Sequence, residues 1–324
     1  MRLGLDKVLL NWLLVFAVGW PSQTTAAPEV VVSIKPVHSL IAGVMTGVGA
    51  PELLARGARS PHNLHLSPSD VRKLSHADLV FWVGQGLESA LAKVLLATVD
   101  GSRRVTLISL PGMQLLPLRQ GGVWDRHSHA ENSDVQDGHA TVQLEHEHNA
   151  GLEQQVNSHI WLSPVNAGRI VESAAAALSR IDPENAAHYQ RNAELMLARI
   201  RMMEQELGRQ LSPVSGAPYV VFHDAYAYFE HHYGLNAVGS VTVNPEHLPG
   251  ARSIQRLRSK IKSLNARCVF SEPQFEPGVV RTLLEGSTAH GGRLDPLGAD
   301  IPAGPDAYFL MMEQLAAALV DCLQ

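Results

Sequence analysis

The chain has 324 residues, with 26 Lys and Arg against 31 Asp and Glu, and its formal net charge is -5 with 16 His left uncounted. This balance argues against a nucleic acid partner, which calls for a concentrated basic face. The length exceeds one typical domain and the hydrophobic content is 45%. We therefore expect two domains, each of about 100 to 150 residues with its own core.

The N-terminus has the pattern of an export signal. Arg2 and Lys7 precede an apolar run from Val8 to Trp20, and small residues follow up to Ala27. A run of about a dozen residues is too short to span a bilayer, which needs about 20. We expect a signal over residues 1–27 and a mature protein in the periplasm, without membrane insertion.

The first half of the mature chain alternates strand and helix patterns. The β-branched runs Val30–Ile34, Ala77–Val83 and Val105–Leu110 predict strands, and Ser67–Ser75 and Leu87–Thr98 have helical spacing. The first helix begins with the start signal Ser-Pro-Ser-Asp. Strands that alternate with helices predict a parallel sheet with both faces covered.

A second series of the same kind follows in the last third of the chain. It consists of four predicted strands and intervening helices such as Arg252–Leu264, the strands being Tyr219–His223, Ala237–Val243, Arg267–Ser271 and Gly292–Asp295. The pattern therefore predicts an α/β fold with two lobes.

A long helix is predicted between the lobes. Residues 183–211 contain regularly spaced apolar residues among charged ones, with Asp182 as N-cap and Pro183 at the first helical position. Such a helix is about 40 Å long and acts as a stiff strut, so the lobes should move little against each other. The expected lobes are residues 28–182 and 212–324.

Residues 119–155 do not fit either core, because they have almost no apolar periodicity and are rich in His, Asp and Glu. We expect a mobile loop inserted in the first lobe. It is either a weak metal-collecting element or a solvated linker, and its histidines are His127, His129, His139, His146 and His148.

Three further histidines are the candidate metal ligands. His62, His159 and His223 each lie at a predicted strand end or helix start, where loops close over a common site. Neutral imidazole suits zinc, and three such ligands leave a fourth position for a carboxylate or water. A lone His is more often a surface or core residue, so the pattern alone leaves each one a candidate.

The chain has only two cysteines, Cys268 and Cys322. An oxidising compartment favours a disulfide between them, which would pin the C-terminal helix to the second lobe. A metal or catalytic pair is the alternative, although the long spacing and the lack of a nearby His weigh against it.

Motifs along the whole mature chain resemble those of the zinc-binding proteins of ABC-type zinc importers. In chain order they are IKPVHSL at 34–40, PH at 61–62 with PSD at 68–70, ADLV at 77–80, HIWLSP at 159–164, VFHDAY at 221–226, TVNPE at 242–246, CVFSEPQF at 268–275 and LDPLG at 294–298. The resemblance implies two α/β lobes joined by a backbone helix, with the metal in the cleft between them. It implies a monomer that captures zinc in the periplasm and delivers it to a membrane permease driven by an ATPase, without enzymatic activity.

The resemblance also assigns residues. It implies that His62 and His159 from the first lobe and His223 from the second bind zinc, and that the two cysteines form the family disulfide. Asp295 lies where manganese-binding relatives use an Asp ligand, so it is expected at the metal or next to its ligands. Glu272 is expected to have a structural hydrogen-bonding role.

The fourth ligand stays open at this point. Some zinc-binding members have Glu immediately before the first His ligand, where this chain has Pro61. Water, Asp295 or the nearby His65 are the remaining candidates, with a surface role favoured for His65.

Three other functions compete with zinc delivery. A zinc-dependent hydrolase would also use three His with an open position, but no His-Glu-x-x-His motif is present. A manganese or iron carrier of the same fold would prefer carboxylate ligands, and those relatives have Glu where this chain has His223. An adhesin role, as in some relatives, is compatible with the export signal.

Overall fold

The computed structural model describes residues 26–119, 155–242, 250–275 and 278–324. Residues 1–25 of the expected signal lie outside these ranges. The five histidines expected to collect metal also lie outside them, in residues 120–154.

The first lobe is built on a four-stranded parallel sheet with the strand order β2-β1-β3-β4. Alternate residues of the strands point to opposite faces. Val31, Val80 and Trp82 pack with the helices α2 and α3, whereas Val32 and Phe81 belong to the large core shared with α1. The bounds are β1 Val30–Val32, α1 Lys35–Val44, β2 Glu52–Leu53, α2 Pro68–His76, β3 Leu79–Trp82, α3 Ser89–Thr98 and β4 Arg104–Thr106.

The second lobe repeats this arrangement. Its parallel sheet has the order β6-β5-β7-β8, which is the order of the first sheet with β5 in the place of β1. Helices α8 and α9 cover one face, where Leu257 and Leu283 pack with Val220 and Phe222. The bounds are β5 Tyr219–His223, α7 Ala227–Tyr233, β6 Ala237–Thr242, α8 Ala251–Ser263, β7 Cys268–Ser271, α9 Gly278–Leu284, β8 His290–Arg293 and α10 Ala307–Leu323.

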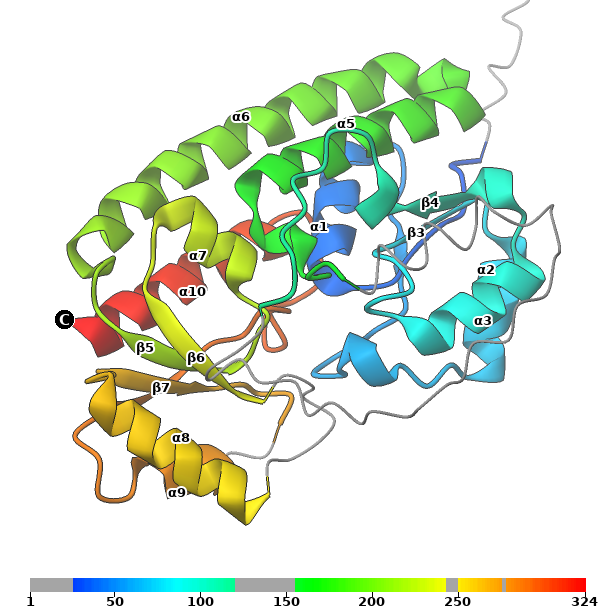
Figure 1. Ribbon diagram of the computed structural model, residues 1–324. Coiled ribbons are helices and arrows are strands. Elements are labelled where there is room, and N and C mark those ends of the chain that lie inside the picture. Colours follow the sequence, from blue (N-terminus) through cyan, green and yellow to red (C-terminus); the bar gives the residue numbers. More distant parts are fainter. Residues whose placement is uncertain (1–25, 120–154, 243–249, 276–277) are drawn as a thin grey trace, which may run out of the picture.

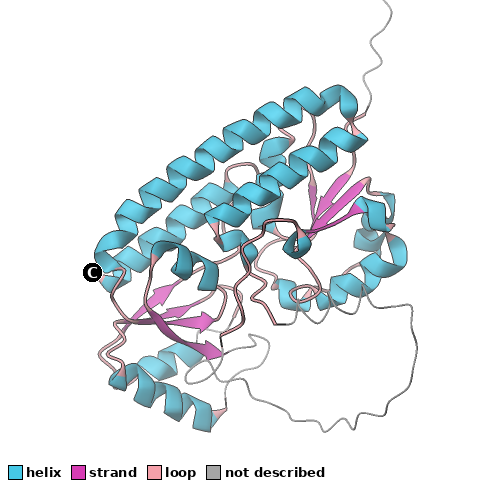
Figure 2. Ribbon diagram, turned by 45° about the horizontal axis from the view of Figure 1, so that its top comes forward, coloured by secondary structure: helices cyan, strands magenta, loops and turns pink. Residues whose placement is uncertain are grey.

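Two long helices connect the lobes. Helices α5 (Pro164–Ile181) and α6 (Ala186–Leu211) run side by side, and α6 extends from one lobe to the other (Figures 1 and 2). The two-lobed α/β fold with a joining helix is thus confirmed. The helical segment starts at Pro183 with Asp182 in the N-cap position, as expected, but Pro183–Asn185 form a 3-10 turn that leads into α6, whose own N-cap is Asn185. The Asp182 carboxylate caps no backbone N–H and instead accepts hydrogen bonds from Tyr189 Oη at 2.6 Å and Asn185 Nδ2 at 2.8 Å.

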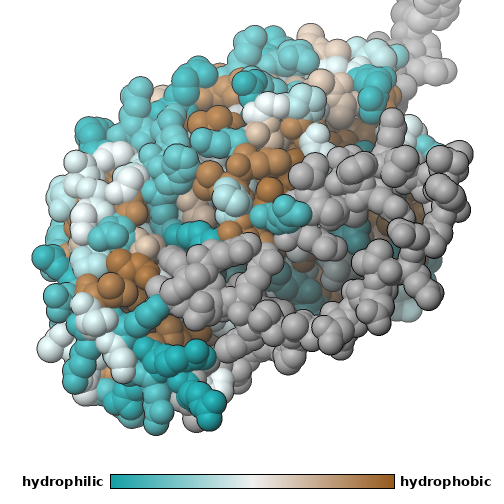
Figure 3. Space-filling view, in the orientation of Figure 1, coloured by the Kyte–Doolittle hydropathy of each residue, from teal (hydrophilic) through white to brown (hydrophobic). Residues whose placement is uncertain are grey.

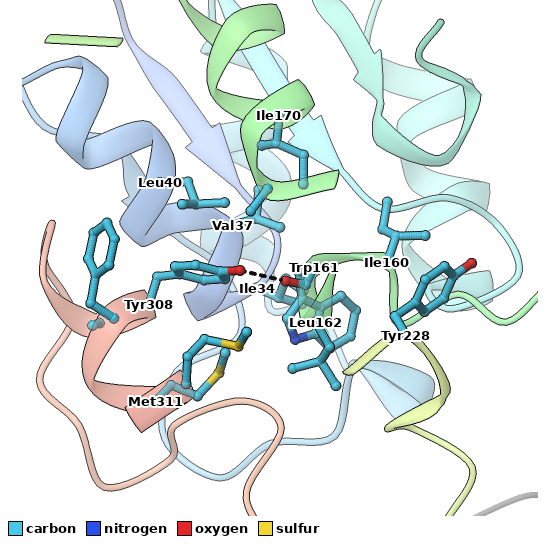
Figure 4. Close-up of a cluster of buried hydrophobic side chains, with 14 of the residues drawn as sticks. Ile34, Val37, Leu40, Ile160, Trp161, Leu162, Ile170, Tyr228, Tyr308 and Met311 are labelled. Atoms are coloured by element: carbon cyan, nitrogen blue, oxygen red, sulfur yellow. Dashed lines mark hydrogen bonds between the residues drawn. The ribbon is translucent and has the colours of Figure 1, made fainter. Parts of the chain in front are cut away.

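The lobes also share one continuous core. Tyr308 Oη of α10 donates to the carbonyl oxygen of Trp161 at 3.0 Å, among apolar side chains of α1 and α5 (Figure 4). The Trp161 indole nitrogen donates to the carbonyl oxygen of Pro296 at 2.8 Å. The buried Lys35 ammonium donates to three backbone carbonyls in the loop after β8, those of Gly298, Ala299 and Ile301. These contacts hold the start of α1 against the C-terminal part of the chain.

The two cysteines form the expected disulfide, with a Cα–Cα distance of 6.2 Å. The disulfide joins β7 to α10, so it pins the C-terminal helix to the second sheet. The helix start expected at Ser-Pro-Ser-Asp is also present, as a capping box between Ser67 and Asp70 at the start of α2. Several predicted strands extend beyond the observed ones. β1 ends at Val32 because α1 begins at Lys35, β3 spans only Leu79–Trp82, and β4 gives way to a 3-10 turn at Leu107. The strand expected at Gly292–Asp295 lies two residues earlier, as β8.

The described helices include none that combines the length and the apolar character of a membrane span. The surface of the second lobe over α8 is hydrophilic (Figure 3). Arg252, Arg256 and Lys262 are the exposed basic side chains of this helix.

Candidate metal centre

His62 enters the site from the loop that follows the carboxyl end of β2. It lies in the 3-10 turn Pro61–Asn63, where Pro61 takes the first position and fixes the backbone φ angle. The His62 Nε2 atom is buried and has no hydrogen-bond partner among the described residues. This nitrogen is therefore available to bind a group that enters the site.

His159 is oriented by Asn157. The Asn157 Oδ1 atom lies 2.9 Å from His159 Nδ1 and also accepts from the His159 backbone N–H at 3.0 Å. The Asn157 Nδ2 group donates to the carbonyl oxygen of Asp224, which fixes the orientation of the amide. An amide oxygen can only accept, so His159 carries its proton on Nδ1 and presents a bare Nε2 to the site.

His223 is the last residue of β5 and is oriented by a carboxylate of the neighbouring strand. Glu272 follows β7 directly, and its Oε1 atom lies 2.7 Å from His223 Nδ1. Both side chains are almost fully buried. The contact again places the proton on Nδ1 and leaves Nε2 free to bind a metal, as is common for metal-ligating histidines.

The three rings converge from both lobes. Their ligand nitrogens all lie within 4.8 Å of one another, and the ring centroids are 5.0 to 5.8 Å apart. The Nε2 atoms of His159 and His223 are only 3.1 Å apart. Two bare nitrogen lone pairs at this distance repel each other unless a cation lies between them. The arrangement is that of a three-histidine metal site.

The site favours neutral imidazoles. Burial and the neighbouring His223 lower the pKa of His62 to about 3. Burial lowers the pKa of His159 well below its usual value, and the other two rings add to the shift. Neutral imidazole is the form that binds a metal, so protons compete weakly at these two positions.

A small cavity lies at the three rings and is lined by residues of both lobes. Its volume is about 10 Å³, which is room for one water-sized particle. The residues that line it include Trp161, Phe275, Pro296 and Leu297, together with the three histidines and Glu272. Apolar walls of this kind limit the access of water to the ligands.

The other predicted site residues lie further out. The Asp295 carboxylate accepts from Gln274 Nε2 at 2.8 Å, Leu297 N at 3.0 Å and Ala299 N at 2.5 Å, so it organises the loop after β8. His65 is exposed. Neither belongs to the group of ligand atoms that converge in the described part of the chain.

Most of these residues lie at or after the carboxyl ends of strands, where open parallel sheets bind their ligands. His62 follows β2, His223 ends β5, Glu272 follows β7 and Asp295 follows β8, whereas His159 directly precedes the 3-10 turn Ile160–Leu162. Sequence reasoning missed Asn157 as the partner of His159. The only signal was its position two residues before a candidate ligand, which is too weak to single it out.

Two lobes with parallel sheets and a three-histidine site at their seam define a two-lobed metal-binding protein. The family described as zinc-uptake complex component A, periplasmic, matches residues 30–322. The chain belongs to this family, whose members are transport components of the periplasm and not enzymes. The expected location and the expected class are thereby confirmed.

Similar proteins agree with this assignment. The chain is 41% identical to the high-affinity zinc uptake system protein ZnuA of Brucella abortus over 304 residues, 91% of each chain. It is 36% identical to ZnuA of Yersinia pestis, over 92% of each chain. The fold is similar to the crystal structure of a ZnuA deletion mutant with zinc bound, with a TM-score of 0.70, 24% identity, and 92% of this chain and 98% of the other covered.

Proposed function

We propose that this protein captures one zinc ion in the periplasm and delivers it to the permease of an ABC-type importer. The observation that carries the proposal is the convergence of ring nitrogens from His62, His159 and His223 at the seam of the lobes. The family and the relatives named for high-affinity zinc uptake support zinc as the cargo.

The donor set supports zinc over manganese or iron. The convergent group in the described residues consists of three imidazoles, and harder cations prefer carboxylates. Glu272, the carboxylate that lines the cavity, has one oxygen engaged with His223. A zinc ion bound by three neutral nitrogens needs one further ligand to complete its tetrahedron.

We infer that water is this fourth ligand. The oxygens of Asp295 accept three hydrogen bonds within the second lobe, which would have to break before the carboxylate could bind a metal. His65 is exposed and Pro61 offers no side-chain donor. An exchangeable water ligand also suits a carrier, because the permease can begin to remove the metal at that position.

The test is to measure zinc content and affinity for the purified mature chain and for His62→Ala, His159→Ala and His223→Ala. Each variant should lose the tight zinc, whereas the matched control His65→Ala should keep it. Deleting residues 120–154 should remove only weaker binding by the five histidines in that segment.

Two outcomes would contradict the proposal. If tight binding survives the three single substitutions, the triad is not the high-affinity site. If manganese displaces zinc at equal concentration, the protein is a manganese carrier of the same fold. Delivery is tested separately, by measuring zinc transfer to the permease and its ATPase in membranes.

A further inference from the structure

The described residues on either side of 120–154 pair with each other at the seam between the lobes. Leu118 N donates to the carbonyl oxygen of Gln155 at 3.0 Å, and Asn157 N donates to that of Leu116 at 2.8 Å. An antiparallel bridge pairs Pro117 with Val156. This short ladder consists of residues 116–118 and 155–157. It includes Asn157, and the ligand His159 follows two residues later.

Arg119, the next residue after the ladder, reaches across the seam to the second lobe. Its Nε donates to Asp224 Oδ1 at 2.8 Å, its Nη2 pairs with the same oxygen, and its Nη1 donates to Glu230 Oε2 at 2.6 Å. The two carboxylate side chains are only 7% and 4% exposed, so water screens these ion pairs little. A planar guanidinium can make these bonds together, which a lysine ammonium cannot do with the same geometry.

The stretch that Arg119 holds begins at a metal ligand. Asp224 follows His223 directly, and its carbonyl oxygen accepts from Asn157 Nδ2 at 2.6 Å. Tyr228 Oη donates to the carbonyl oxygen of Asn157 at 2.7 Å and accepts from Leu116 N at 3.1 Å. Residues 223–230 of the second lobe are therefore attached to the ladder of the first lobe at several points.

Removing the Arg119 charge would leave two buried carboxylates, Asp224 and Glu230, facing the ladder without this partner. Uncompensated buried charge is strongly unfavourable, and residues 223–230 can lower this cost by moving toward solvent. Such a movement carries His223 away from His62 and His159. A metal that is bound by ligands from both lobes would then leave more readily.

We propose that Arg119 is a positioning residue that holds His223 in register with the two first-lobe histidines and so sets how fast the site releases its metal. This inference rests on the proposed function only in requiring that the triad binds zinc. Arg119 is not one of the metal ligands, and it lies in the first lobe, across the seam from His223, the ligand that it positions.

The experiment compares the full-length mature protein with Arg119→Met, Arg119→Lys and Arg169→Met, each loaded with one equivalent of zinc. Stopped-flow mixing with excess chromophoric chelator gives the dissociation rate, and mixing metal-free protein with limiting zinc gives the association rate. Arg169 is the matched control, since its ion pair with Glu172 lies within α5 and both partners are about half exposed.

Arg119→Met should release zinc about tenfold faster or more, the size of effect seen when partners of metal ligands are lost. Its association rate should stay within about threefold of the parent rate, because changes at one binding site act mostly on dissociation. Arg119→Lys should give an intermediate rate, and Arg169→Met should match the parent.

A purely structural role predicts a different result. In that case Arg119→Met would lower the melting temperature of metal-free and zinc-loaded protein equally and would leave the dissociation rate unchanged, which would overturn the proposal. If Arg119→Met does not fold, Arg119→Lys decides by the same criterion. Failure of the proposed function looks different again, because the parent protein itself would then bind no tight zinc.

Discussion

Glu272 Oε1 lies 2.7 Å from His223 Nδ1, at the adjacent carboxyl ends of β7 and β5. The corresponding partner of His159 is the neutral amide of Asn157. The two lobes thus support their ligands differently, because only the second lobe places a carboxylate behind its imidazole. A carboxylate makes the imidazole a stronger donor to the metal.

We predict that Glu272→Ala weakens zinc affinity by about 10-fold to 100-fold, because the imidazole of His223 loses both its charge partner and its fixed tautomer. Glu272→Gln retains an acceptor oxygen for Nδ1 and should have a smaller effect. Competition titrations against a zinc chelator measure both. If the two variants bind zinc with equal affinity, the hydrogen bond to His223 contributes little and the carboxylate charge accounts for the loss.

The metal-free protein should lose stability as the pH falls below about 6.5. The pKa of His62 is lowered to about 3 in the folded state, so the unfolded chain binds more protons between the two values. Stability is therefore fully present above the unfolded pKa and decreases toward pH 3, by up to about 1.4 kcal/mol per pH unit for this residue. Urea unfolding in the presence of chelator gives the unfolding free energy at each pH for the parent and for His62→Leu. The contribution of His62 is the difference between the slopes of these free energies against pH.

Glu88 should act in the opposite direction. Burial raises its pKa to about 7, while its Oε2 atom accepts from the backbone N–H groups of Val83 and Gly84. Because the folded pKa is raised, this stability is present below pH 4.5 and is lost as the pH rises toward 7. We predict that Glu88→Gln removes this dependence. The stability of the variant relative to the parent should then be about 3 kcal/mol greater at pH 8 than at pH 4.5. Denaturant titrations at the two pH values would show no such difference if Glu88 were ionised throughout.

Replacing both cysteines by Ala should cost about 4 kcal/mol of unfolding free energy. The disulfide closes a loop with a sequence separation of 54, and the loss reflects the greater freedom of the unfolded chain. Zinc stoichiometry should remain unchanged, because none of the three histidine ligands lies in the loop from Cys268 to Cys322 that the disulfide closes. Chemical denaturation together with metal analysis checks both parts, and loss of the tight zinc would show that α10 is needed to form the site.

Local patterns in the sequence were sufficient for much of this molecule. Strand β5 has the predicted bounds, Tyr219–His223, because a β-branched and aromatic run is buried on both faces. The capping box of α2 depends on Ser67 and Asp70, three residues apart, so it is visible without a structure. The three histidines were singled out because each follows a predicted strand or precedes a helix.

Long-range partners could not be predicted in this way. Asn157 is only two residues from His159, but its amide is oriented by the carbonyl oxygen of Asp224, 67 residues further along the chain, and no local pattern reports that contact. The bond between Tyr308 and Trp161 joins residues 147 positions apart. Strand β2 has only two residues, Glu52 and Leu53, and its place in the sheet comes from pairing with β1 rather than from its own preference.

The disulfide has a consequence for the chemistry of capture. Both cysteines of the chain are used in it, so the protein has no thiolate to offer a metal. Imidazole nitrogens do not change their state with the redox potential of the surroundings, whereas thiolates do. The affinity of the site should therefore be the same under oxidising and reducing conditions as long as the fold persists. Oxidants such as peroxide, which release zinc from cysteine-rich sites, have no sulfur ligand to attack here.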